Sequence, residues 1–137
     1  MLRDHKAVAY ALMRLALGMN IFGHGLFRIL SGVGNFADGM AQGMDKGPLP
    51  HALTLGFGYC IPWIELTIGS LLILGLFTRF ALIAGALMMV ALTFGTTSVQ
   101  NWNGAGTQLT YSFIFFAMLW LVEANTFSVD QVLSRRK

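Results

Sequence analysis

The sequence has few charged residues, a single cysteine and three prolines. Charged residues make up 11% of its 137 positions, against roughly 25% in a typical soluble domain, while hydrophobic residues make up 55% and the mean hydropathy is +0.65. So few polar side chains cannot cover a soluble domain of this size, and disorder would need low hydrophobicity and high charge. The one cysteine, Cys60, excludes a disulfide or a dithiol couple within one chain. The composition therefore predicts an integral membrane protein that forms one transmembrane domain over residues 1–137.

Four apolar stretches are long enough to cross a hydrocarbon core of about 30 Å, which takes roughly 20 helical residues. The strict alternation of a membrane β-barrel is absent from the sequence, so helices are the expected spanning structure. The sequence thus predicts an all-α fold, an integral membrane four-helix bundle. The predicted spans are residues 7–30, 52–76, 78–97 and 108–125.

The outer loop between the first two predicted spans, residues 31–51, is rich in glycine. Phe36, Met40 and Met44 recur in it every four residues, which is the spacing of one face of a helix. Two interpretations stay open for this segment. It is a short amphipathic helix lying on the outer leaflet, or a flexible loop with scattered methionines.

Basic residues are distributed unequally around the predicted spans. Lys6, Arg79 and residues 135–137 all fall on one side of a four-span bundle, whereas the other side carries Lys46. Because cytoplasmic loops carry an excess of lysine and arginine, we expect both termini in the cytoplasm and the chain in a bacterial or archaeal cytoplasmic membrane. The formal net charge of +3 reflects this bias and gives no reason to expect nucleic-acid binding.

Ionisable side chains interrupt the predicted spans at Arg14, His24 and Glu65, and Arg28 lies near the outer end of the first span. A charge inside a membrane costs about 2.5–3.5 kcal/mol on insertion scales, so such residues usually face the bundle interior and have a partner. At about 100° per residue, Arg14, His24 and Arg28 share one third of the first helix circumference with two glycines, and that arc is expected to face inward. The glycines predicted to pack helices together are Gly18, Gly25 and Gly69.

Arg14 and Glu65 are predicted to form an ion pair between the first two spans. Counted at about 1.5 Å per residue from the cytoplasmic ends, Arg14 lies roughly 10 Å deep and Glu65 roughly 16 Å, a gap that an arginine side chain can close. Pro62 is expected to kink the helix one turn before Glu65. The pair either fixes the packing of two helices or lines a polar cavity that holds a ligand or passes protons, and in that second case Arg14 and Glu65 are the candidate catalytic residues.

His24 has three interpretations. It is a hydrogen-bonded interior residue, a contact for a quinone or other small ligand together with Arg28 one turn away, or a ligand of haem or a metal. Haem held between helices usually needs two histidines, and only His51 could be the second on that side. No metal-ligand spacing is present elsewhere, so the sequence predicts no metal site. Cys60 is expected to pack as a small apolar residue.

Two motifs carry a family resemblance. The first contains RLALG and FGHGLFR between Arg14 and Arg28, and the second is PWIELTIGSLLILGLFTR from Pro62 to Arg79. In order and spacing they resemble the DoxX/DoxD family of small four-helix membrane proteins over nearly the whole chain. The resemblance implies a subunit of a respiratory or redox complex, because one branch of that family is similar to the membrane subunit of a thiosulfate:quinone oxidoreductase. This chain has no dithiol, flavin or nucleotide motif, so we expect it to carry no intrinsic cofactor. Binding of a quinone stays possible, and any electrons would have to come from a protein partner.

Three functions stay open at this stage. In the first, the chain is a quinone-interacting subunit of an oxidoreductase, with His24 and Arg28 donating to quinone carbonyls and the Glu65–Arg14 pair handling protons. In the second, it is a structural accessory subunit of a larger membrane complex, which its small size and lack of a cofactor motif favour. A carrier of small solutes or protons is less favoured, because four helices without an inverted repeat are few for a transporter. The expected partners are membrane lipid and a protein of an oxidoreductase or respiratory complex.

Overall fold

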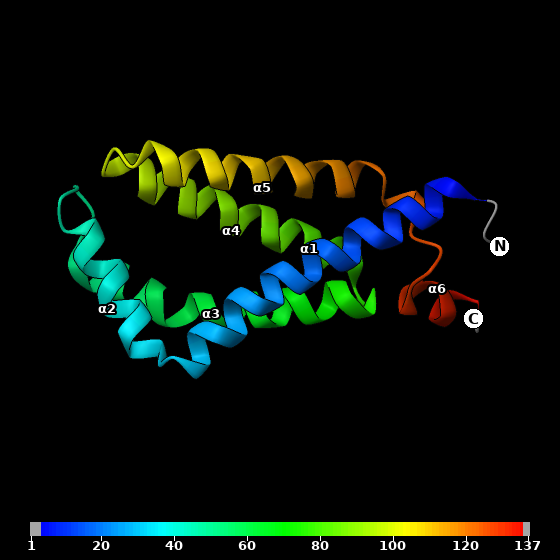
Figure 1. Cartoon of the computed structure of the whole chain (residues 1–137), viewed down its shortest axis with the longest axis horizontal. Helices are drawn as coiled ribbons and strands as arrows, with labels where there is room; N and C mark the ends of the chain where they lie inside the picture. Colours follow the sequence, from blue (N-terminus) through cyan, green and yellow to red (C-terminus); the bar gives the residue numbers. More distant parts are fainter. Residues whose placement is uncertain (1–3, 136–137) are drawn as a thin grey trace.

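The computed structural model describes residues 4–135, and within that range the chain is helical and has no strand (Figure 1). The all-α prediction is therefore confirmed, but the number of helices differs, because two short α-helices join the four long ones in the described residues. The elements are α1 (His5–Leu30), α2 (Val33–Met44), α3 (His51–Leu74), α4 (Thr78–Ser98), α5 (Trp102–Trp120), the 3₁₀ turn η1 (Val122–Ala124) and α6 (Val129–Ser134).

The long helices α1, α3 and α4 closely follow the first three predicted spans, but α5 begins and ends earlier than the fourth predicted span, 108–125. The side chain of Asn101 accepts a hydrogen bond of 3.0 Å from the backbone N–H of Gly104 and so caps the first turn of α5. Asparagine is a preferred N-cap residue. The predicted span begins at residue 108 and therefore omits the first turns of α5.

The segment 31–51 contains α2, which agrees with the helical interpretation of its methionine spacing. This helix packs on α3 as well as presenting an outer surface, because Ala37 and Ala41 are fully buried. A Cβ atom placed on Gly58 of α3 would lie 2.8 Å from the Cα atom of Ala37. Close approach of the two backbones thus holds α2 across one end of the bundle.

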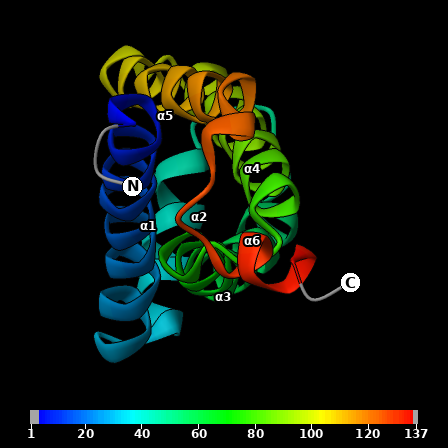
Figure 2. The same cartoon turned by 90° about the vertical axis from the view of Figure 1, so that its right-hand side faces the viewer.

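The four long helices form two pairs that surround the centre of the molecule (Figure 2). Helix α1 packs along α3 over much of its length, and α4 packs along α5. The α3–α4 turn joins the pairs, whereas α1 and α5 touch each other at few points. Figure 1 shows α2 at one end of the bundle and the start of α1 and α6 at the opposite end. The loosest seam of the bundle is therefore the one between α1 and α5.

Glycines set the spacing between α1 and α3. A Cβ atom on Gly25 would lie 2.5 Å from the backbone nitrogen of Leu66, and one on Gly69 would collide with the backbone of Phe22. Gly18 sits against Ile73 in the same manner, at 2.9 Å. These contacts fix how far α1 is shifted along α3, which decides the partners of the charged side chains.

Two helices, α3 and α4, are long and apolar enough to cross a membrane by length and composition. The polar residues of α1 and α5 lower the hydropathy of those two helices. Each of the four long helices nevertheless exposes large apolar side chains on the outside of the bundle. These include Leu12 and Met19 on α1, Trp63 and Leu74 on α3, Phe80 and Leu87 on α4, and Phe113 and Phe116 on α5.

Candidate functional site

The central feature of the candidate site is an ion pair between Arg28 on α1 and Glu65 on α3. The Nη1 atom of Arg28 donates to both carboxylate oxygens of Glu65, at 2.5 and 2.6 Å. The Glu65 side chain is 4% exposed and that of Arg28 is 28% exposed. The close approach of α1 to α3 at Gly25, one turn before Arg28, brings the guanidinium within reach of the carboxylate.

The predicted ion pair between Arg14 and Glu65 is not formed, because Glu65 pairs with Arg28 instead. Gly25 lies against Leu66, so Glu65 is level with the C-terminal half of α1. Arg14 is eleven residues before Gly25, which at 1.5 Å per residue places it about 16 Å away along the axis. The prediction counted depth from the ends of both helices as though they began at the same level, and the glycine contacts shift them.

Arg14 instead holds the C-terminal segment against the other end of the bundle. Its side chain is buried and donates at 2.8 Å to Oδ1 of Asn125 and at 2.8 Å to the backbone oxygen of Phe127. Gly75, whose φ of 65° favours glycine, leaves the space that the guanidinium occupies. This arrangement makes Arg14 a packing residue of that segment and separates it from Glu65.

The aromatic ring of Phe36 on α2 covers the Arg28 guanidinium. The Cζ atom of Arg28 lies 4.3 Å from the centre of that ring, within the range of a cation–π contact. Arg28 is thus engaged by a carboxylate on one helix and by an aromatic face on another. Together these contacts hold the positive charge at the place where α1, α2 and α3 meet.

A cavity of about 260 Å³ lies beside the ion pair and is bordered by all five of α1, α2, α3, α4 and α5. Its walls combine polar groups with apolar side chains and two aromatic rings. The lining residues are Ile21, His24, Arg28, Phe36, Glu65, Met89, Leu92, Gly104, Thr107, Gln108 and Tyr111. The cavity therefore brings His24, Arg28 and Glu65 together, three of the four ionisable residues singled out from the sequence.

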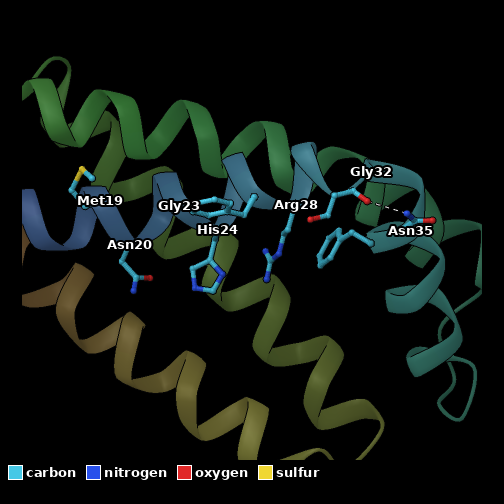
Figure 3. Close-up of a pocket in the computed structure, with 10 residues that line it drawn as sticks. Met19, Asn20, Gly23, His24, Arg28, Gly32 and Asn35 are labelled. Carbon is cyan, nitrogen blue, oxygen red and sulfur yellow. Dashed lines mark hydrogen bonds between the residues drawn. The ribbon is translucent and has the colours of Figure 1, made fainter.

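His24 stands at the outer wall of this cavity and is exposed. Its ring meets that of Tyr111 on α5 edge-on, with centroids 6.5 Å apart, and the Tyr111 hydroxyl donates at 2.9 Å to Asn20. Figure 3 shows Asn20, His24 and Arg28 projecting from α1 toward the side where α4 and α5 run. The three residues are spaced four apart, so they form one polar stripe along α1.

His51, the second histidine considered for haem, lies elsewhere. Its Nδ1 atom is 2.7 Å from Oδ1 of Asp45 at the exposed start of α3, and it does not line the cavity. Within residues 4–135, no group of three or more His, Cys, Asp or Glu side chains is placed to hold a metal ion. Cys60, expected to pack as a small apolar residue, lies exposed on the surface of α3.

Residues 6–110, more than half of the sequence, match the family model of "Methylamine utilisation protein MauE". The chain belongs to the MauE family. Neither the curated proteins nor the solved structures gave a match. The MauE match runs from the start of α1 into α5 and includes every residue that lines the cavity except Tyr111.

The assignment to the DoxX/DoxD family was wrong, because the matching family is MauE and no DoxX match was found. The motifs that suggested it contain Gly18, Gly25, Gly69 and Glu65, which the structure places in helix contacts and in an ion pair. Small residues that let helices approach, and a charge pair where they meet, are requirements of many membrane bundles. Motifs of this kind report packing more directly than ancestry.

Sequence reasoning placed Tyr111 in the fourth span but missed Thr107 and Gln108 on the α5 side of this cavity. Thr107, Gln108 and Tyr111 share one face of α5, and Oε1 of Gln108 accepts a hydrogen bond of 2.7 Å from Thr96 on α4. A span that begins at residue 108 leaves Thr107 in the preceding loop, whereas the structure places it in α5. Recognising Asn101 as an N-cap would have extended the helix and revealed the shared face.

Proposed function

We propose that this chain is an integral membrane accessory protein of a methylamine utilisation system and that it acts with a protein partner. The printed name of its family supports the link to methylamine utilisation. The apolar outer surface of the four long helices supports a membrane location in which α1, α3, α4 and α5 all span. The charges of α1 then face the bundle interior, which is where a membrane protein tolerates them.

The proposed orientation places both ends of the chain in the cytoplasm. Arg79, at the start of α4, lies at the same end of the bundle as the start of α1 and as α6, and Arg135 follows α6 (Figure 1). Lys46 lies at the opposite end, after α2. An excess of arginine and lysine at one end supports the cytoplasmic side for that end.

The observation that carries the accessory role is that the interior charge site is already occupied. A methylammonium ion would be recognised by a buried carboxylate and an aromatic face. Arg28 already occupies both of these groups, because its guanidinium pairs with the Glu65 carboxylate and lies over the ring of Phe36. Binding the amine there would require expelling a tethered guanidinium, so we favour a supporting role over carriage of methylamine.

Two experiments test this proposal. Deletion of the gene from its source organism should abolish growth on methylamine while leaving growth on an unrelated carbon and nitrogen source intact, and the wild-type gene should restore it. Liposomes that contain only the purified chain should take up radiolabelled methylamine no faster than empty liposomes. Normal growth of the deletion strain would contradict the link to methylamine, and protein-dependent uptake that Glu65→Gln abolishes would replace the accessory role by a carrier.

A further inference from the structure

The cavity beside Arg28 and Glu65 reaches the outside through the seam between α1 and α5. A groove of about 700 Å³ along α1 shares His24, Arg28 and Phe36 with the cavity lining (Figure 3). A second groove, of about 390 Å³ between α1 and α5, shares Thr107 and Tyr111 with it. Since α1 and α5 touch at few points, a molecule dissolved in the surrounding membrane could enter the cavity between these two helices, from the side of the bundle.

The polar groups of the cavity are mainly hydrogen-bond donors. Arg28 uses only Nη1 for Glu65, which leaves Nε and Nη2 as donors. Gln108 accepts from Thr96 through Oε1, which leaves its amide nitrogen to donate. His24 adds one N–H in its neutral form. A matching ligand therefore presents acceptors, such as carbonyl oxygens.

The charge of the cavity selects a neutral ligand. Glu65 is the one carboxylate among the lining residues that the structure places here, and Arg28 neutralises it. An anion such as a lipid phosphate would be repelled by the Glu65 carboxylate beside the guanidinium. A cation would gain little, because Arg28 already neutralises that carboxylate. Neither ion gains the full attraction of an unpaired opposite charge.

The shape and walls of the cavity fit a single ring with an apolar tail. Its volume of about 260 Å³ is just below the roughly 300–1,000 Å³ that holds a whole drug-sized ligand. Ile21, Met89 and Leu92 supply apolar walls, and the rings of Phe36 and Tyr111 supply faces for stacking. A longer apolar tail would lie in the grooves along α1.

We propose that this cavity binds the head group of a membrane-dissolved quinone, with its carbonyl oxygens accepting from His24, Arg28 and Gln108 and its tail lying in the α1–α5 seam. The assignment rests on the proposed membrane location. It concerns binding, and it gives the chain a ligand through which a partner could communicate with the quinone pool.

The test uses the full chain purified in mild detergent and titrated with decylubiquinone, with binding measured by calorimetry and the co-purified lipids identified by mass spectrometry. We expect saturable binding of one quinone per chain. His24→Ala should weaken it about fivefold to tenfold, the value of one hydrogen bond. His51→Ala, a histidine change away from the cavity, should leave it unchanged. Thr107→Phe should block the cavity, whereas Leu109→Phe on the same helix should not.

The outcomes separate the site from the accessory role. Binding that His24→Ala and Thr107→Phe leave at the wild-type level, phospholipid alone in the cavity, or no saturable binding would each overturn the quinone site. If quinone binding fails while the deletion strain still cannot grow on methylamine, the proposed quinone site is wrong and the accessory role is supported. If quinone binds as expected while the deletion strain grows normally, the link to methylamine falls and the site stands.

Discussion

Removing one member of the Arg28–Glu65 pair should cost far more stability than removing the pair together. The Glu65 side chain is 4% exposed, so Arg28→Ala would leave a buried carboxylate without its partner. Breaking a buried ion pair in this manner costs about 3–5 kcal/mol, and replacing both members by apolar residues is often close to neutral. We therefore expect Arg28→Leu/Glu65→Leu to be more stable than Arg28→Ala.

The assay is a double-mutant cycle on thermal unfolding in detergent, followed by circular dichroism and analysed as differences in the free energy of unfolding. The exposed pair Arg79–Glu123, joined at 2.5 Å with side chains 67% and 84% exposed, serves as the matched control. Disrupting it should change the free energy by less than about 1 kcal/mol. Additive effects of Arg28→Ala and Glu65→Gln would refute the reasoning, because additivity would mean that the two side chains do not interact.

Three further predictions concern the packing, the C-terminal segment and the topology. Gly69→Ala should destabilise the chain by about 1–3 kcal/mol, because its Cβ would collide with the Phe22 backbone. In Gly23→Ala the new Cβ would meet no atom within 4 Å, so this change should stabilise α1 by about 0.5–1 kcal/mol. Equal effects of the two variants on thermal unfolding would contradict the predicted difference in packing. Partial burial alone would raise the pKa of Asp130. The backbone N–H groups of Thr78 and Phe77 donate to its carboxylate, and together with the nearby Arg14 charge they outweigh burial and lower that pKa below its usual range. Asp130 therefore adds stability at neutral pH that is lost as the pH falls through the lowered pKa, so Asp130→Asn should flatten the acid side of an unfolding profile, and an unchanged profile would count against it. In a Cys60→Ser background, an impermeant maleimide should label Asn103→Cys but not Ser134→Cys in intact spheroplasts, and the reverse pattern would invert the proposed orientation.

The positions of the long helices could be predicted from the sequence because apolar length is a local property. Three of the four spans closely matched α1, α3 and α4. Helical spacing alone also places His24 and Arg28 on one face of α1, although the structure leaves His24 exposed at the cavity wall rather than buried in the bundle. What the sequence could not supply was the shift of α1 along α3, which the backbone contacts at Gly25 and Gly69 determine. That shift gave Glu65 a different partner from the one predicted.

The α5 wall of the cavity and the family were missed for different physical reasons. Gln108 lay at the predicted edge of a span, and the capping hydrogen bond of Asn101 that extends the helix is a single-residue signal. The family was misassigned because the glycines and charges of the two motifs are those that close helix packing requires. A short motif therefore determines neither how distant helices are placed against each other nor to which family the chain belongs.

The decisive measurement is growth of the deletion strain on methylamine when it carries the His24→Ala chain at wild-type membrane levels. His24 is exposed at the cavity wall, so its loss should leave the fold intact while weakening the site. We expect slower growth on methylamine with His24→Ala and normal growth with His51→Ala. Equal growth of the two strains would show that the proposed quinone site has no part in methylamine utilisation.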